Sequence, residues 1–169
     1  MKVRTFIRQE LSKLILENFE KPDLIAGVAT GGIAHGVLIA QELGLPFVYV
    51  RPAPKAHGLE NTVEGHVEPG QTVIVVEDLI STGQSSLKAV ASLRNAGCMV
   101  KGLVSIFDYG FDSALQSFKE QKCSYYSLSN YDVVIDQAVK NNYLTRDDSE
   151  HLKTWRVDPE GWGKKLKTS

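Results

Sequence analysis

The sequence predicts an α/β protein with a mostly parallel central sheet flanked by helices. Short runs of β-branched and other apolar residues alternate along the chain with longer segments whose apolar residues recur at helical spacing. Buried parallel strands are apolar along their whole length, whereas amphipathic helices are apolar on one face only. Their alternation is typical of strand–helix–strand units, which build parallel sheets with ligand sites at the carboxyl ends of the strands.

The composition is that of an ordinary globular domain. The chain has 169 residues, 43% of them hydrophobic and 23% charged, which suffices for a sizeable core. The net charge of −1 gives no electrostatic reason to expect nucleic acid or a membrane as partner. Residues 1–20 form a charged amphipathic segment unlike a signal peptide, and no apolar run approaches membrane-spanning length, so we expect a cytoplasmic location. Cys98 and Cys123 are expected to be unpaired core thiols.

The first part of the chain is predicted to form two helices and two strands. Residues 2–19 carry apolar side chains at helical spacing, and residues 24–28 form the first buried strand. A glycine-containing turn at 29–32 leads into a second helix that ends at Gly44, and residues 46–50 form the next strand. His35, in the second helix, is expected to be a structural histidine.

Residues 51–65 are predicted to be a long polar loop without regular structure, with the next strand beginning near Gln71. Long loops in compact domains are usually functional or disordered. This one carries three donors for an anion, Arg51, Lys55 and His57, which could close over a pyrophosphate. A solvated loop with incidental charges is the alternative.

The most informative stretch runs from Val73 to Ser86. Four apolar residues predict a strand buried on both faces, the acidic pair Glu77 and Asp78 follows, and a small hydroxyl-rich turn leads to a helix that begins near Gln84. A helix start binds phosphate because its first N–H groups lack partners and its dipole adds partial positive charge. The candidate phosphate donors are Ser81, Thr82, Gly83, Gln84 and Ser85.

The acidic pair Glu77 and Asp78 suits the sugar beside that phosphate. Carboxylates accept hydrogen bonds from vicinal ribose hydroxyls, or bind Mg²⁺ through water. Either feature alone would be explained by an ordinary loop and a capped helix. Strand, acidic pair, turn and helix start in immediate succession favour a sugar-phosphate site. The turn at Thr30 and Gly31 is a second candidate anion site, where backbone N–H groups could meet a pyrophosphate, although a tight turn alone would also explain its glycines.

The second part of the chain continues the alternation of helices and strands. The predicted elements are a helix over residues 87–95, a strand over 99–107 with a bulge at Gly102, a helix over 111–118, a strand over 123–128 and a helix beginning at 129–132. We expect one core domain over residues 1–145. Residues 146–169 are expected to be a tail that packs on the core or on a dimer interface, because it carries Trp155 and Trp162.

The stretch Val75 to Gly83, written VVEDLISTG, resembles the 5-phosphoribosyl 1-pyrophosphate (PRPP) motif of the type I phosphoribosyltransferases. Together with Arg51 and the PKAHG of residues 54–58, it is similar to the orotate phosphoribosyltransferases. The resemblance implies the type I phosphoribosyltransferase fold and the transfer of the 5-phosphoribosyl group from PRPP to orotate, giving orotidine 5′-monophosphate and pyrophosphate for pyrimidine synthesis.

The same resemblance implies roles for individual residues. Glu77 and Asp78 would hold the ribose hydroxyls, with Mg²⁺ carried by PRPP and water near them and no direct protein cage. Arg51, Lys55 and His57 would bind PRPP and, with Asp78, be catalytic. In that family the loop that carries them reaches the partner's site in a homodimer, so we expect a homodimer in which the 51–65 loop does the same.

The chain also departs from the family pattern. Pro52 follows Arg51 where many members have a lysine, some members have a lysine at the position of Gly31, and some have an orotate-contacting arginine within residues 107–110. Members usually carry a further segment before the first helix, which forms a hood over the base, so we expect this chain to hold the ribose phosphate better than the base. A phosphoribosyltransferase for another base and a non-catalytic PRPP-binding regulator therefore stay open.

Overall fold

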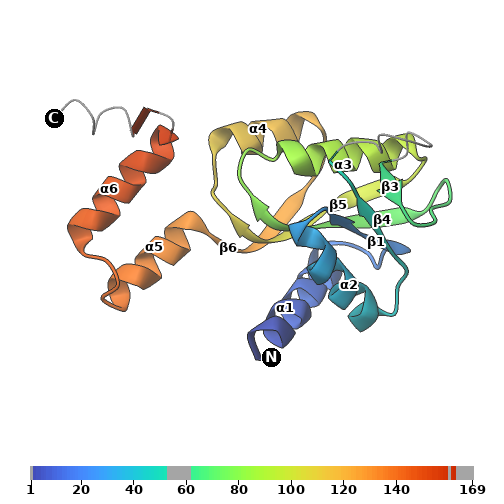
Figure 1. Cartoon of the computed structure of the whole chain (residues 1–169), viewed down its shortest axis with the longest axis horizontal. Helices are drawn as coiled ribbons and strands as arrows, with labels where there is room; N and C mark the ends of the chain where they lie inside the picture. The colour runs from blue at the N-terminus through green and yellow to red at the C-terminus, as the bar shows by residue number, and fades with distance from the viewer. Residues whose placement is uncertain (1, 53–61, 160, 163–169) are drawn as a thin grey trace.

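A six-stranded sheet in the order β3-β2-β1-β4-β5-β6 forms the centre of the molecule. The structure, a computed structural model, describes residues 2–52, 62–159 and 161–162 (Figure 1). The strands are β1 Leu24–Val28, β2 Phe47–Val50, β3 Val63–Glu64, β4 Thr72–Ile80, β5 Met99–Asp108 and β6 Tyr125–Asn130. All neighbours pair in parallel except β2 and β3, which are antiparallel. The predicted α/β class with a mostly parallel sheet is confirmed.

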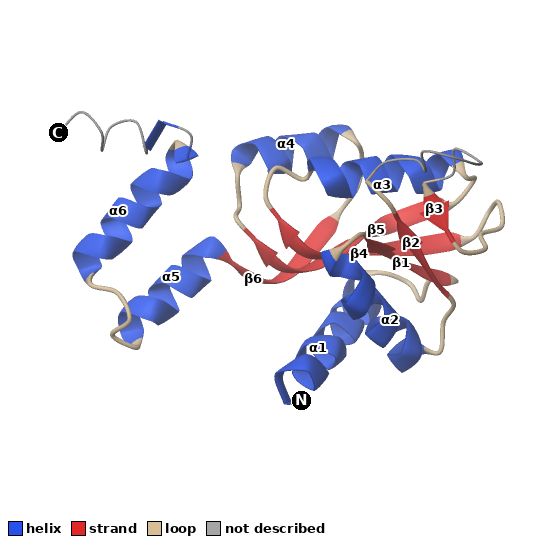
Figure 2. Ribbon diagram, viewed as in Figure 1, coloured by secondary structure: helices blue, strands red, loops and turns tan. Residues whose placement is uncertain are grey.

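Helices cover both faces of this sheet (Figure 2). They are α1 Lys2–Asn18, α2 Gly31–Leu43, α3 Gln84–Asn95, α4 Asp112–Glu120, α5 Tyr131–Lys140 and α6 Arg146–Val157. The pair α1 and α2 lies on one face and the pair α3 and α4 on the other, whereas α5 and α6 extend beyond the β6 edge (Figure 1). Two apolar cores result, one on each side of the sheet.

Strand β4 is one of the two central strands and is buried on both faces, as its unbroken apolar run predicts. Successive side chains of a strand point to opposite faces. Val73 and Val75 accordingly join the core under α3 and α4, while Ile74 and Val76 join the core under α1 and α2. All four side chains are fully buried. This double anchoring fixes the carboxyl end of β4, where the candidate site lies.

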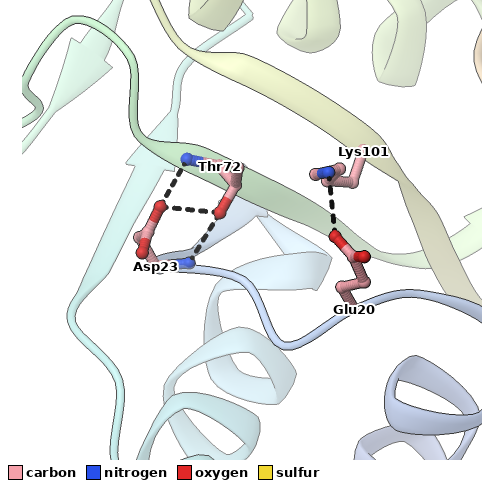
Figure 3. A network of polar contacts seen from close by, with 4 residues as sticks. All are labelled: Glu20, Asp23, Thr72 and Lys101. Atoms are coloured by element: carbon pink, nitrogen blue, oxygen red, sulfur yellow. Dashed lines mark hydrogen bonds and ion pairs between the residues drawn. The ribbon is translucent and has the colours of Figure 1, made fainter.

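Two polar contacts join the segment between α1 and β1 to strands β4 and β5 (Figure 3). The Asp23 carboxylate accepts hydrogen bonds from the Thr72 N–H and hydroxyl at 2.8 and 2.7 Å. These bonds hold the pKa of Asp23 below its ordinary value. Lys101 reaches Glu20 at 3.4 Å.

Lys101 is also the extra residue of a bulge in β5, since Val73 pairs with Val100 and Ile74 with Gly102. The sequence analysis predicted this bulge one residue later, at Gly102.

Three expectations about secondary structure were wrong in detail. The 51–65 segment is not wholly irregular, because Val63 and Glu64 form β3 against β2. A two-residue strand is too short for alternation to reveal it. Strand β4 continues through Glu77 and Asp78 to Ile80, so the acidic pair lies within the strand and not after it. Strand β6 begins and ends two residues later than predicted, at Tyr125 and Asn130.

Residues 146–157 form a helix, α6, which the polar sequence of the tail did not reveal. Its start carries a capping box in which Thr145 and Asp148 exchange hydrogen bonds. Trp155 packs with Tyr109, Phe111 and Tyr131, with ring centroids 5.5 to 6.2 Å apart. This part of the tail therefore contacts its own chain, while the division into two units at residue 145 stays a prediction. In the described part of the chain, no helix has the length and apolar character needed to cross a membrane.

Candidate active site

The two carboxylates of the acidic pair point to opposite faces of β4. Glu77 is only 5% exposed and lies toward the start of α3. Its Oε1 accepts hydrogen bonds from the hydroxyls of Ser86 at 3.1 Å and Ser85 at 3.3 Å. Asp78 is exposed on the other face. The pair is therefore not one shared binding surface: Asp78 is accessible to a ligand, while Glu77 joins β4 to the first turn of α3.

The pKa of Glu77 is raised to about 7, mainly by burial. The negative charge of Asp78 adds to this rise, whereas the hydrogen bonds from Ser86 and Ser85 oppose it. Glu77 thus changes its charge within the physiological pH range. Ser86, which is 1% exposed, supports Glu77 and was not among the predicted site residues. Its position in the first turn of a helix that follows an acidic pair was the signal that could have identified it.

The turn between β1 and α2 lies directly beside Asp78. A Cβ atom built on Gly31 would overlap with the Asp78 carboxylate, and one built on Gly32 would overlap with the carbonyl oxygen of Val76. Thr30 is exposed and is the N-cap residue of α2, and the peptide bond between Ala29 and Thr30 is cis. The Thr30 side chain makes no capping hydrogen bond to the first turn of α2. Thr30, Gly31 and Asp78, which the sequence assigned to one ligand, are thus brought together.

The turn from Ser81 to Gly83 leads into α3 as predicted, and α3 begins at Gln84. Gly83 is the N-cap residue with φ of 74°, a conformation that favours glycine. A Cβ atom on it would also come within 2.6 Å of the Phe118 ring. Within the described residues, no N-cap side chain accepts a hydrogen bond from the first N–H groups of α3. The donors for a phosphate here are these N–H groups and the hydroxyls of Ser81 and Thr82. The Ser85 hydroxyl donates to Glu77 at 3.3 Å, and its predicted contact with the phosphate stays a prediction.

Arg51 leaves the end of β2 beside the same helix. Its Nη1 reaches Glu64 Oε1 at 3.3 Å, and its backbone N–H donates to the carbonyl of Thr62 at 2.8 Å. Together with Lys88, it lines a pocket of about 240 Å³ between the ends of β1 and β2 and the first turns of α3. The sequence interpretation missed Lys88, although its spacing of four residues from Gln84 places it on the same face of α3. Lys55 and His57 lie outside the described residues.

Metal binding at this site would depend on the ligand. Within the described ranges, no three His, Cys, Asp or Glu side chains gather closely enough to hold a metal ion. The exposed carboxylate of Asp78 is the group that a metal ion bound to a phosphate ligand could approach. His35 is half-buried in α2, and no predicted role depends on it.

This chain is similar in sequence and in fold to phosphoribosyltransferases. The phosphoribosyl transferase domain family matches residues 3–142. An orotate phosphoribosyltransferase of Phocaeicola vulgatus is 52% identical over 160 residues, which cover 95% of this chain and 76% of that protein. The crystal structure of orotate phosphoribosyltransferase from Aeropyrum pernix superposes with a TM-score of 0.71 at 28% identity, covering 79% of this chain and 74% of that one.

Similarity of fold alone does not identify which base such an enzyme uses. The crystal structure of an adenine phosphoribosyltransferase from Thermoanaerobacter pseudethanolicus superposes with a TM-score of 0.64 at 25% identity, covering 77% of this chain and 81% of that one. The sequence match is the more specific result, because it extends at about half identity over nearly the whole chain. The chain belongs to the phosphoribosyltransferase family, in the group of the orotate phosphoribosyltransferases.

Proposed function

We propose that this chain transfers the 5-phosphoribosyl group of PRPP to orotate, giving orotidine 5′-monophosphate (OMP) and pyrophosphate for pyrimidine synthesis. The observation that carries the proposal is the meeting of three groups at the end of β4: the exposed Asp78 carboxylate, the Gly31 turn and the start of α3. A ribose 5-phosphate with a pyrophosphate at C1 needs acceptors for its hydroxyls and donors for its phosphates at both ends. These three groups supply them in that arrangement.

Each group has one task in the proposed complex. The Asp78 carboxylate accepts hydrogen bonds from the ribose hydroxyls, and the N–H groups at the start of α3 hold the 5′-phosphate with Ser81 and Thr82. Glu77 takes no direct part in this arrangement; it keeps the first turn of α3 against β4 through Ser85 and Ser86. This arrangement assigns the ribose to Asp78, and the expectation that Glu77 also binds the ribose stays a prediction.

The reaction exchanges one bond at C1 of the ribose for another. The bond to the pyrophosphate oxygen breaks, its electron pair leaves with pyrophosphate, and a ring nitrogen of orotate, whose proton passes to solvent, forms the new bond. Arg51 offsets the negative charge that gathers on the departing pyrophosphate, and Lys55 and His57 are proposed to do the same. Mg²⁺ bound to PRPP would offset more of this charge, with the exposed Asp78 as the carboxylate nearest to its waters.

The proposal includes a homodimer in which the loop of one protomer completes the site of its partner. The support is the resemblance of the 51–65 segment to the loop of the family. A mixing experiment tests it with Asp78→Asn and Lys55→Ala, each inactive alone. Equal amounts, mixed and allowed to exchange protomers, regain about a quarter of the wild-type activity, because half the dimers are mixed and each has one intact site. No recovery despite confirmed exchange would show that each loop serves its own protomer.

An acceptor panel tests the proposed reaction. The chain is incubated with PRPP and Mg²⁺ and with orotate, uracil or adenine in separate reactions, and pyrophosphate and nucleotide are measured. We expect pyrophosphate and OMP with orotate only. Turnover with another base would identify a phosphoribosyltransferase of different specificity, and PRPP binding without any turnover would support a regulator. The cytoplasmic location expected from the sequence stays a prediction.

A further inference from the structure

A cavity of about 620 Å³ lies beside the Ser81–Thr82 turn and shares no described lining residue with the pocket of Arg51 and Lys88. Its volume is within the range of small-molecule sites, roughly 300–1,000 Å³. The turn forms one wall, the loop from β5 to α4 with Gly110 and Phe111 forms another, and the end of α6 with Arg156 closes it. A ligand whose phosphate lies at the start of α3 has this cavity next to it, because both share the Ser81–Thr82 turn.

Arg156 is the cation that lines this cavity within the described part of the chain. Its Nη1 donates to Asp132 Oδ2 at 2.7 Å, and its guanidinium carbon lies 5.9 Å from the centre of the Tyr131 ring. The same Nη1 lies against Gly110, where an added Cβ atom would be 3.6 Å away. Asp132 and Tyr131, both on α5, thus orient the guanidinium, and the other guanidinium nitrogens have no acceptor among the described residues.

We propose that Arg156 recognises the carboxylate of the acceptor base and thereby selects orotate. The inference rests on the proposed function. Orotate differs from uracil by one carboxylate, and removing that charge from water requires a cation or several hydrogen-bond donors. Arginine is suited to this because its planar fork matches the geometry of a carboxylate. The end of β5 and the loop after it carry Asp108 and Tyr109 and no cation, and α6 brings Arg156 to that loop from a distant part of the sequence.

The other charges around the cavity make this position specific. Asp112 and Asp158 also line the cavity, so among the described lining residues Arg156 attracts an anion and these two carboxylates oppose its binding. Asp158 Oδ1 accepts a hydrogen bond from the Gly161 N–H at 2.9 Å, whereas Asp112 is exposed at the start of α4. Removing the charge of Asp112 should therefore favour an acidic base without disturbing Arg156.

Two nucleotides that differ only in the carboxylate test this proposal. Binding of OMP and of uridine 5′-monophosphate (UMP) is measured by calorimetry with the 169-residue chain. We expect the wild type to bind OMP more tightly than UMP by about tenfold to a hundredfold, the usual size of a charge-assisted hydrogen bond. Arg156→Gln should abolish this preference by weakening OMP binding, with UMP binding unchanged. Arg156→Lys should keep part of the preference.

Two control variants separate recognition from stability. Arg146→Gln removes the same kind of charge from the first turn of α6, about 15 Å along the helix from Arg156, and should leave the preference unchanged. Asp112→Asn should increase OMP affinity severalfold more than UMP affinity, because only OMP carries the base carboxylate as a second anionic group. This second variant tests the proposal even if Arg156→Gln does not fold.

The alternative outcomes are distinguishable. An unchanged preference in Arg156→Gln, or an equal loss of OMP and UMP binding, overturns the proposed role of Arg156 while the proposed function stands. Equal affinity of the wild type for OMP and UMP would likewise overturn the proposed role of Arg156 and leave the proposed function standing. If the wild type binds neither nucleotide, the proposed function fails and the role of Arg156 with it.

Discussion

The Asp78 carboxylate lies against the α-carbon of Gly31, with no room for a side chain between them. Asp78 comes from β4 and Gly31 from the turn between β1 and α2, so two segments that are far apart in the sequence form one surface. The contact depends on the parallel pairing of β1 with β4, in which Gly27 lies opposite Val76. A ligand held by Asp78 must therefore also face the backbone of the Gly31 turn.

Alanine at Gly31 should mainly weaken PRPP binding, whereas alanine at Gly32 should mainly lower stability. The added methyl group at Gly31 meets a side-chain carboxylate, which can rotate away, whereas at Gly32 it meets the carbonyl of Val76 in the central strand. Gly31→Ala should lower PRPP affinity by at least about tenfold and change stability little. Gly32→Ala should lower the free energy of unfolding by about 1–3 kcal/mol. Urea unfolding and PRPP calorimetry on both variants check this, and equal effects at both positions would contradict it.

The buried Glu77 should make stability fall as pH rises toward neutrality. Its pKa is about 7 in the folded protein against an ordinary value of 4.5. Below the ordinary value, Glu77 is protonated in both the folded and the unfolded protein, so the stability that depends on its protonated form is fully present. Between the two values, only the unfolded state has released the proton, so the free energy of unfolding falls by about 1.4 kcal/mol per pH unit, or about 3 kcal/mol in total.

Glu77→Gln is the control because it cannot titrate. We expect the stability of the wild type relative to Glu77→Gln to decrease between about pH 4.5 and about pH 7 when both are unfolded by urea without ligand. In Ser86→Ala, which lacks one hydrogen bond to the ionised carboxylate, the decrease should extend to higher pH. Parallel stability curves for wild type and Glu77→Gln would show that the carboxylate is not buried as described.

Arg51 and Glu64 form an ion pair whose two halves can be removed separately. Both side chains are partly exposed, so breaking the pair should cost no more than about 1 kcal/mol of stability in either variant. Only Arg51→Gln also removes the positive charge proposed for pyrophosphate, and it should lower kcat/KM for PRPP by about tenfold to a hundredfold. Glu64→Gln should change it by less than about threefold. Steady-state kinetics with varied PRPP decide this, and equal losses would indicate that the pair acts only through structure.

Local patterns predicted the elements that bind a ligand through their backbone. The apolar run of β4, the turn with Gly83 and the start of α3 at Gln84 follow from neighbouring residues alone. The alternation of strands and helices likewise predicted a ligand site at the carboxyl ends of the strands, where the Gly31 turn and the end of β4 meet. These features are decided by sequence-local chemistry and by the general rules of parallel sheets.

Features that depend on distant contacts were missed or misjudged. The separation of Glu77 from Asp78 follows from β4 continuing to Ile80, which its pairing with β5 sustains. The short strand β3 exists only because β2 lies beside it. The position of Arg156 depends on α5 and α6 packing against the loop after β5, and nothing near residue 156 in the sequence indicates that neighbour.

PRPP binding by wild type and Asp78→Asn, measured by calorimetry with Mg²⁺ present, tests the central claim most directly. Asparagine keeps the size of the side chain but removes the charge that accepts hydrogen bonds from the ribose hydroxyls. We expect the wild type to bind PRPP and Asp78→Asn to bind it at least about tenfold more weakly. The stability of the variant should be unchanged because the side chain is exposed. Normal PRPP binding by Asp78→Asn would contradict the assignment of Asp78 to the ribose, and with it the proposed arrangement of PRPP at the end of β4.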